Sequence, residues 1–240
     1  MNKVLPDEIV LFAAGFGTRM GSLTSGMPKS LLQAFGKPIL YHALDLCKTY
    51  RFKRIFINTH YLPDKIEAAI EQYLRINPDF PKIVIAYEPE LLETGGTIRH
   101  LYNSYSFGSN LVFTMNTDVI LHTKSDIFAE MIDYVQPDKM DFLLLLQNFD
   151  KAIGYKGSGD FNLTTEGKVT RLKSAMTYDY MYTGLGLIKP EVVAADERKI
   201  FSLQDYYFRS DRVFGLKAKQ LKWYHATHPE DLISMGNTSS

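Results

Sequence analysis

A glycine-rich turn and two cations near the N-terminus have the types and the spacing that a polyphosphate site needs. The turn occupies residues 13–18 (AAGFGT), and its small residues let backbone N–H groups approach a ligand closely. Arg19 and Lys29 follow, and Pro28 stiffens the backbone just before the lysine. Backbone donors followed by positive charge can bind and neutralise phosphate groups. The turn residues expected to contact a nucleotide are Ala13, Ala14, Gly15, Gly17 and Thr18.

Two common phosphate-binding loops do not match this turn. A Walker A loop needs Gly-Lys-Ser/Thr, whereas Gly17 is followed by Thr18 and Arg19. A dinucleotide-binding fingerprint needs a small residue three positions after Gly17, where this chain has Met20. On the glycines alone, an ordinary surface turn stays an alternative.

Acidic side chains and a second glycine pair follow later apolar segments. Asp118 comes just after the apolar run 111–115, and a carboxylate beside phosphates is a natural ligand for Mg²⁺, although it also suits the cap of a turn. Glu88 follows the run 83–87. The segment 92–96 (LETGG) precedes a helical pattern, where a helix start capped by Thr94 is the alternative to a ligand site.

Strands and helices alternate through the first half of the chain. We expect strands at 9–12, 54–58, 83–87 and 111–115, and helices at 39–47, 63–73 and 94–105. This order predicts an α/β fold, a three-layer α/β/α Rossmann-like sandwich around a mixed, mainly parallel sheet. Ligands bind such sheets at the carboxyl ends of the strands, so Gly15, Glu88 and Asp118 should converge on one rim.

The second half is less regular and shows no linker. We expect helices at 125–135, 202–208 and 229–235, strands at 142–147, 180–188, 213–216 and 221–224, and a hairpin within 159–169. We therefore predict a single domain over residues 1–240. Its nucleotide-binding half would span about 1–120 and its acceptor half 121–235, with a frayed tail at 236–240.

Composition narrows the class of partner. The 240 residues include 27 basic and 27 acidic side chains, and this zero net charge argues against a nucleic-acid-binding surface. The single cysteine, Cys47, excludes a disulfide framework. No apolar run approaches the length of a membrane span, and the N-terminus does not resemble a signal peptide. We expect a cytoplasmic protein that acts on small molecules as a monomer or small homo-oligomer.

The whole first loop resembles the signature of the sugar-1-phosphate nucleotidyltransferases. The matching residues are Ala-Ala-Gly-x-Gly-Thr-Arg-Met at 13–20, followed by Pro28 and Lys29. The resemblance implies a GT-A-like fold and synthesis of an NDP-sugar and pyrophosphate from an NTP and a sugar 1-phosphate. It also implies that Arg19 and Lys29 act as catalytic residues on the phosphates, and that Asp118 in an Asn-x-Asp context binds Mg²⁺.

The segment 92–96 is most similar to the branch that uridylylates N-acetylmuramate 1-phosphate, an activity of cell-wall (peptidoglycan) recycling. The resemblance implies UTP as the donor. The further residues that it assigns to the nucleotide are Glu88, Thr94, Gly95, Gly96 and Asn116. Those that it assigns to the sugar are Asp160, Thr183 and Gly184.

The chain departs from the family near its C-terminus. The family usually has Trp-x-Asp-x-Gly-Thr where this chain has Trp223 to His228, so His225 replaces a second metal-binding Asp. Imidazole suits Mn²⁺ or Zn²⁺ better than Mg²⁺, so we expect Mg²⁺ or, if His225 is a ligand, Mn²⁺. The alternative is that His225 only bonds a phosphate or packs beside Trp223. The alternatives are a mannose-1-phosphate guanylyltransferase, a phosphocholine cytidylyltransferase, and a degenerate nucleotide-binding regulatory protein.

Overall fold

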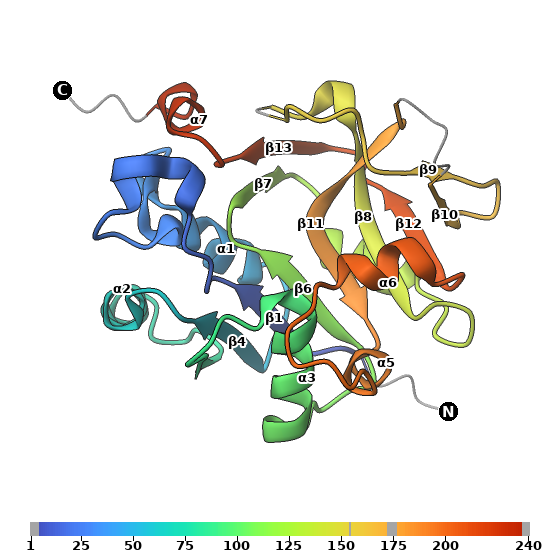
Figure 1. Ribbon diagram of the computed structural model, residues 1–240, viewed down its shortest axis with the longest axis horizontal. Helices are drawn as coiled ribbons and strands as arrows, with labels where there is room; N and C mark the ends of the chain where they lie inside the picture. Colours follow the sequence, from blue (N-terminus) through green and yellow to red (C-terminus); the bar gives the residue numbers. More distant parts are fainter. Residues whose placement is uncertain (1–4, 154, 172–176, 237–240) are drawn as a thin grey trace.

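A seven-stranded sheet with strand order β12-β8-β11-β6-β1-β4-β5 forms the centre of the molecule (Figure 1). The structure is a computed structural model that describes residues 5–153, 155–171 and 177–236. Within this sheet only β11 runs antiparallel to its neighbours. The strands are β1 (Glu8–Phe12), β4 (Arg54–Thr59), β5 (Lys82–Tyr87), β6 (Val112–Asn116), β8 (Phe142–Asn148), β11 (Tyr180–Ile188) and β12 (Val213–Lys217). The predicted mixed, mainly parallel sheet is confirmed.

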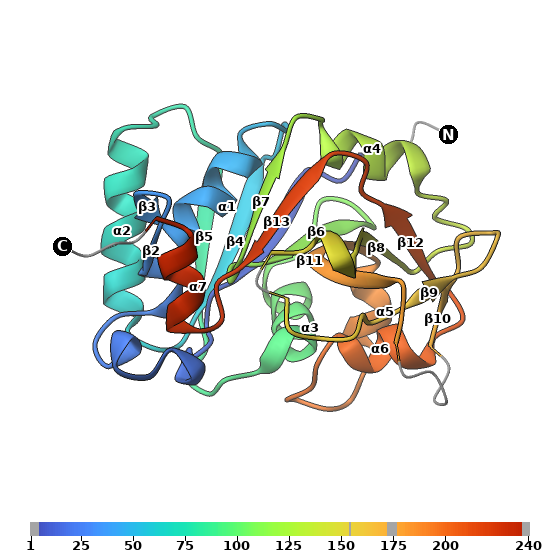
Figure 2. The same ribbon diagram turned by 90° about the horizontal axis from the view of Figure 1, so that it is seen from above.

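Helices cover both faces of the sheet (Figure 2). One face carries α1 (Ile39–Cys47), α2 (Pro63–Arg75) and α4 (Ile127–Tyr134), and the other carries α3 (Glu93–Tyr105), α5 (Pro190–Ala194) and α6 (Gln204–Arg209). Successive strand residues point to opposite faces. Ile9 and Leu11 therefore enter one apolar core, and Val10 enters the other. The three-layer α/β/α prediction is confirmed.

Three small ladders and short helices surround the main sheet. The strands β7 (Val119–Thr123) and β13 (Leu221–His225) pair antiparallel, and so do β2 (Gln33–Ala34) with β3 (Lys37–Pro38) and β9 (Asn162–Leu163) with β10 (Val169–Thr170). The remaining elements are α7 (Pro229–Ser234) and the 3₁₀ helices η1 (Thr18–Thr24), η2 (Lys29–Leu31) and η3 (Phe149–Lys151). No helix in the described part of the chain is long and apolar enough to cross a membrane. Most of the predicted tail, residues 237–240, lies outside the described residues.

The strand β7 was not predicted from the sequence. It begins three residues after β6 ends, and its partner β13 lies about a hundred residues away in the chain, so neither hydrophobic period nor spacing indicates it. The ladder pairs Val119 with His225, and the N–H of Ala226 donates to the carbonyl of Asp118 at 3.0 Å. The pairing thereby places His225, where the chain departs from the pattern that it otherwise resembles, beside Asp118.

The first turn of α3 packs closely against the segment 196–206. The N–H groups of Gly95 and Gly96 donate to the carbonyl oxygen of Phe201, at 2.9 and 3.1 Å. A Cβ atom at Gly95 would lie 2.8 Å from that oxygen and closer still to the Phe201 ring, while one at Gly96 would collide with the carbonyl of Lys199. The glycine pair is therefore required for this backbone contact.

The close contact at Gly95 predicts whether a substitution there raises or lowers the free energy of unfolding. In an unconstrained helix, Gly→Ala stabilises by up to about 1 kcal/mol. At Gly95 overpacking of about 1–3 kcal/mol should outweigh that gain. We therefore expect Gly95→Ala to lower the free energy of unfolding measured in urea. The control is Gly26→Ala, which has nothing within 4 Å of an added Cβ and should change stability by less than about 0.5 kcal/mol. Equal effects at the two positions would contradict the packing argument.

Candidate active site

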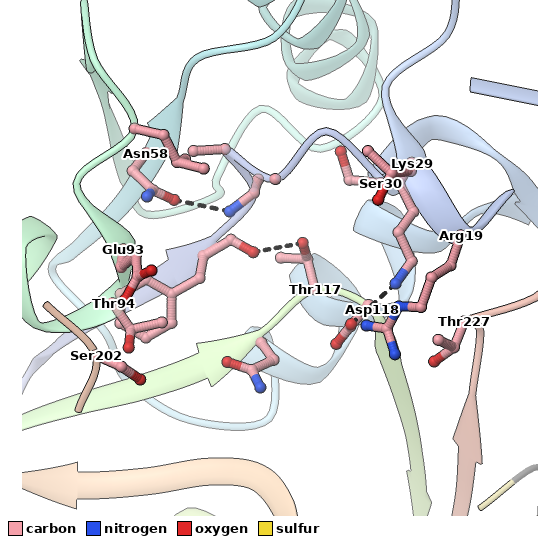
Figure 3. A pocket seen from close by; sticks show the side chains of 18 of the residues that line it. Arg19, Lys29, Ser30, Asn58, Glu93, Thr94, Thr117, Asp118, Ser202 and Thr227 are labelled. Carbon is pink, nitrogen blue, oxygen red and sulfur yellow. Dashed lines mark hydrogen bonds and ion pairs between the residues drawn. The ribbon is translucent and has the colours of Figure 1, made fainter. Parts of the chain in front are cut away.

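A cavity of about 560 Å³ opens at the carboxyl ends of β1, β4 and β6 (Figure 3). The whole predicted loop lines it: Ala13, Ala14, Gly15, Gly17, Thr18 and Arg19. The later predicted residues Lys29, Thr94, Asn116 and Asp118 line it as well. Of the three residues expected to converge on this rim, Gly15 and Asp118 are brought together, and Glu88 is not.

Glu88 lies behind the cavity wall and acts through Asn58. It is 1% exposed, and it accepts hydrogen bonds from Asn58 Nδ2 at 2.9 Å and from Thr97 Oγ1 at 2.6 Å. Asn58 Oδ1 in turn accepts from the N–H of Ala13 at 2.7 Å. This chain of bonds fixes the start of the glycine-rich turn, so Glu88 is placed to position the loop rather than to contact a ligand.

One end of the cavity is cationic and holds the predicted Asp118. Lys29 Nζ lies 2.9 Å from Asp118 Oδ2, and His225 Nε2 lies 3.7 Å from the same oxygen. Burial alone would raise the pKa of Asp118, but the charge of Lys29 and the nearby imidazole of His225 hold it well below its usual range. Asp118 is therefore ionised at neutral pH. Arg19 forms no ion pair with any residue in the described ranges.

The opposite end carries hydroxyl and carboxylate groups. Figure 3 shows Glu93, Thr94 and Ser202 there, across the cavity from Lys29 and Arg19. Glu93 is exposed and has a φ of +59°, a left-handed conformation that is uncommon outside glycine. The start of α3 at Glu93 has no side-chain cap, so Thr94 does not act as the N-cap that was the alternative prediction.

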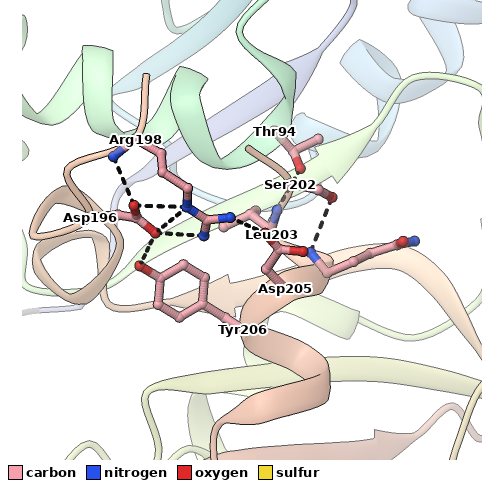
Figure 4. Close-up of polar contacts among 8 residues, drawn as sticks. Thr94, Asp196, Arg198, Ser202, Leu203, Asp205 and Tyr206 are labelled. Carbon is pink, nitrogen blue, oxygen red and sulfur yellow. Dashed lines mark hydrogen bonds and ion pairs between the residues drawn. The ribbon is translucent and has the colours of Figure 1, made fainter. Parts of the chain in front are cut away.

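The segment 196–206 forms the far wall, and polar contacts hold it in place (Figure 4). The N–H of Leu203 donates to Thr94 Oγ1 at 3.0 Å. Arg198 pairs with Asp196 and with Asp205, at 2.7 and 2.5 Å. These contacts hold Ser202 and Gln204 in the cavity wall. Sequence reasoning predicted a helix here but missed both cavity residues.

A second cavity of about 250 Å³ adjoins the first. Four residues line both cavities: Arg19, Asn116, Asp118 and Gln204. Aromatic side chains form much of the wall of the smaller cavity: Tyr155, Phe161, Tyr182, Tyr207, Phe208 and Trp223. The predicted sugar residues Asp160 and Gly184, together with His225, also line it.

Asp160 presents a sheltered carboxylate to the smaller cavity. Its Oδ2 accepts from the N–H of Tyr182 at 2.8 Å, and Tyr155 OH lies 3.4 Å from Oδ1. Burial raises the pKa of Asp160 and outweighs those hydrogen bonds and the charge of Arg171. The free acceptor capacity of this carboxylate suits a ligand hydroxyl.

The two remaining predicted sugar residues, Thr183 and Gly184, are neighbours on β11 and face opposite sides of the sheet. Gly184 has a φ of +87° at a register shift in β11, and a Cβ there would lie 3.2 Å from that of Asn116. Thr183 points the other way and is fully buried. Its hydroxyl donates to the carbonyl of Leu145 at 2.9 Å, and its own carbonyl accepts from Trp223 Nε1. Thr183 therefore lies behind the wall of the smaller cavity. Gly95 and Gly96, whose N–H groups bond to Phe201, line neither cavity.

Several cavity residues were missed by sequence reasoning. In the larger cavity they are Phe12, Ser30, Asn58, Leu91, Glu93, Thr117, Ser202, Gln204 and Thr227. Some stand beside residues that were predicted, such as Ser30 after Lys29 and Glu93 before Thr94. Ser202, Gln204 and Thr227 enter through long-range packing, and nothing in their local sequence indicates it.

A glycine-rich loop and a cationic end at the carboxyl rim of such a sheet define a nucleotide-binding enzyme site. The chain matches the nucleotidyl transferase family over residues 8–172, and it belongs to that family. It is 31% identical to N-acetylmuramate alpha-1-phosphate uridylyltransferase of Caulobacter vibrioides, over 94% of this chain and 93% of that protein. The resemblance seen in the first loop is confirmed, and the protein is a nucleotidyltransferase.

Two further comparisons support the family and the fold. The chain is 26% identical to probable mannose-1-phosphate guanylyltransferase 1 of Oryza sativa subsp. japonica, over 95% of this chain and 63% of that protein. The crystal structure of HddC from Yersinia pseudotuberculosis superposes with a TM-score of 0.76 at 20% identity, covering 95% of this chain and 97% of that one. The second likeness shows the fold alone.

Proposed function

We propose that this nucleotidyltransferase transfers a uridylyl group from UTP to N-acetylmuramate 1-phosphate, which gives the UDP-sugar and pyrophosphate. The observation that carries the proposal is the junction of two cavities at Arg19, Asn116 and Asp118. UTP would occupy the larger cavity, built mainly from residues 1–120, and the acceptor the smaller one, built mainly from 121–235. The name of the Caulobacter relative supports the choice of base and acceptor.

The reaction is an in-line attack by an oxygen of the sugar phosphate on the α-phosphorus of the NTP. Such transfers depend on positioning and charge neutralisation, and the attacking phosphate is already ionised near neutral pH. Backbone N–H groups of residues 13–18 would hold the nucleotide. Lys29 would bind the α-phosphate and the incoming phosphate, and Arg19 would stabilise the charge that develops on the leaving pyrophosphate.

The donor set at Asp118 fits a divalent cation. Asp118 supplies an ionised carboxylate, and His225 lies 3.7 Å from it. No group of three or more acidic, histidine or cysteine side chains gathers as a metal site among the described residues, so substrate phosphates would complete the coordination, as they do for Mg²⁺ elsewhere. When bound, Mg²⁺ or Mn²⁺ would neutralise charge on the phosphates.

The smaller cavity has the chemistry of a sugar site. Its aromatic side chains offer apolar faces, and Asp160 accepts hydrogen bonds. Gly184 leaves room beside Asn116 at the boundary with the nucleotide cavity. The proposed acceptor would therefore place its ring against the aromatic wall and its phosphate toward Asp118.

A substrate panel tests the proposed function. Pyrophosphate release should be measured with the four NTPs against N-acetylmuramate 1-phosphate, mannose 1-phosphate and phosphocholine. We expect the highest kcat/KM with UTP and N-acetylmuramate 1-phosphate. A higher kcat/KM with GTP and mannose 1-phosphate would favour the guanylyltransferase alternative, which the name of the Oryza relative supports. No turnover with any pair would contradict the proposal.

The proposed role of Arg19 predicts that its removal lowers kcat much more than it changes KM. Because the charge on pyrophosphate grows in the transition state, Arg19→Ala should lower kcat by about 100-fold or more and change KM for UTP much less. Steady-state kinetics with a saturating acceptor measure both constants. Arg75→Ala removes an exposed arginine at the end of α2, remote from both cavities, and should leave them unchanged. A raised KM at normal kcat would show that Arg19 does not selectively stabilise the transition state.

The role of His225 predicts an unusual metal preference. A neutral imidazole in place of a carboxylate should favour Mn²⁺ over Mg²⁺ in both binding and turnover. His225→Asp should reverse this preference, measured by calorimetric titration of each metal into the UTP complex and by the ratio of the two rates. The control is His100→Asp, an exposed substitution on α3. If His225→Ala leaves the preference of the native protein intact, His225 is not a ligand.

A further inference from the structure

Two buried hydroxyl groups in the larger cavity have no hydrogen-bond partner among the residues that the structure describes. Ser30 is 4% exposed and Thr227 is 3% exposed, and neither Ser30 Oγ nor Thr227 Oγ1 bonds to any other described residue. Most buried polar groups in proteins are paired, because an unpaired one loses its bonds to water without replacement. Two such groups in the wall of one cavity are therefore available to a bound ligand.

Both hydroxyls lie at the cationic end of the cavity. Figure 3 shows Ser30 beside Lys29, and Thr227 near Arg19 and Asp118. The hydroxyl and carboxylate end, with Thr94, lies across the cavity. Ser30 and Thr227 line the larger cavity and are absent from the lining of the smaller one, so their ligand belongs on the nucleotide side.

The backbone around each hydroxyl is fixed by bonds of its own. Ser30 is the middle residue of η2, which the bond from the N–H of Leu31 to the carbonyl of Pro28 closes at 2.9 Å. The N–H of Thr227 donates to Asp231 Oδ2 at 2.9 Å, and this carboxylate also caps α7 through His228. The two hydroxyls are thus presented by segments far apart in the sequence, and neither segment depends on the hydroxyl for its shape.

We propose that Ser30 and Thr227 bind the leaving pyrophosphate by donating hydrogen bonds to the β- and γ-phosphoryl oxygens of the NTP. The inference rests on the proposed function, because that function puts a triphosphate in this cavity. A hydroxyl donates one hydrogen bond, and an ionised phosphate oxygen is a strong acceptor for it. The nucleoside end lies opposite, and Thr227 lies near Arg19, to which the proposed function assigns the leaving pyrophosphate.

The matched variants are Ser30→Ala and Thr227→Val, which delete the hydroxyl and keep most of the side-chain volume. Because the hydroxyls are unpaired in the free protein, deletion should leave Tm unchanged or raise it. The Kd values for UTP and inorganic pyrophosphate should rise by about tenfold or more in each variant, while the Kd for UMP should stay the same. Calorimetric titration supplies the Kd values, and thermal denaturation without ligand supplies Tm.

Thr59→Val is the control. The hydroxyl of Thr59 is also fully buried and unpartnered among the described residues, but Thr59 lines neither cavity. This variant should behave like the other two in Tm and should bind UTP and pyrophosphate like the native protein.

Each other outcome has a distinct meaning. Unchanged Kd values for UTP and pyrophosphate in a protein with normal uridylyl transfer would overturn the inference and leave the proposed function standing. A fall in Tm without ligand would show that the hydroxyls serve the fold. An equal loss for UMP would assign them to the α-phosphate, and a loss only for N-acetylmuramate 1-phosphate would assign them to the acceptor. Either result contradicts the pyrophosphate assignment. If the native protein binds neither UTP nor pyrophosphate, both proposals fail.

Discussion

The ion pair between Lys29 and Asp118 connects the two segments on which the site depends. It joins the cation after the glycine-rich turn to the carboxylate after β6, and the two side chains are only 12% and 28% exposed. Sheltered charges are costly unless they are paired, so in the free protein each of these charges compensates the other. In the proposed reaction, a triphosphate that took Lys29 as its partner would release Asp118 to hold a cation. The ion pair would therefore keep both charges compensated until the substrates bind.

The ladder between β7 and β13 brings the C-terminal part of the chain to this pair. Its register sets His225 opposite Val119, and the next residue is bonded to the backbone of Asp118. Trp223, two residues earlier on the same strand, is buried and donates to the carbonyl of Thr183. The departure from the family at His225 thus sits on a backbone that the neighbouring bonds determine.

The sequence was sufficient where the signals are local. The strands β1, β4, β5 and β6 are short apolar runs separated by amphipathic helices, so the parallel half of the sheet and its carboxyl rim could be predicted. The turn at residues 13–18 was predicted for the same reason, because its small residues and the two cations lie within one stretch. Contacts that need two distant segments were missed, as β7 and the wall at 196–206 show.

Which of the predicted residues face a cavity also depends on tertiary packing. Glu88 ends up behind the wall because Asn58, Thr97 and the N–H of Leu92 surround its carboxylate. On β11 the ordinary alternation of strand residues places Gly184 at the smaller cavity and leaves Thr183 in the core. The sequence predicts that two neighbours on a strand face opposite sides, but which side meets a cavity depends on the packing of the neighbouring strands.

The segment 196–206 gives the two cavities a common wall. Through Leu203 it bonds to Thr94 at the nucleoside end, and through Gln204 it lines both cavities. Tyr207 and Phe208, one turn further along α6, line the smaller cavity. Because the bond at Thr94 holds Leu203 at the start of α6, one segment positions residues of both proposed substrate sites.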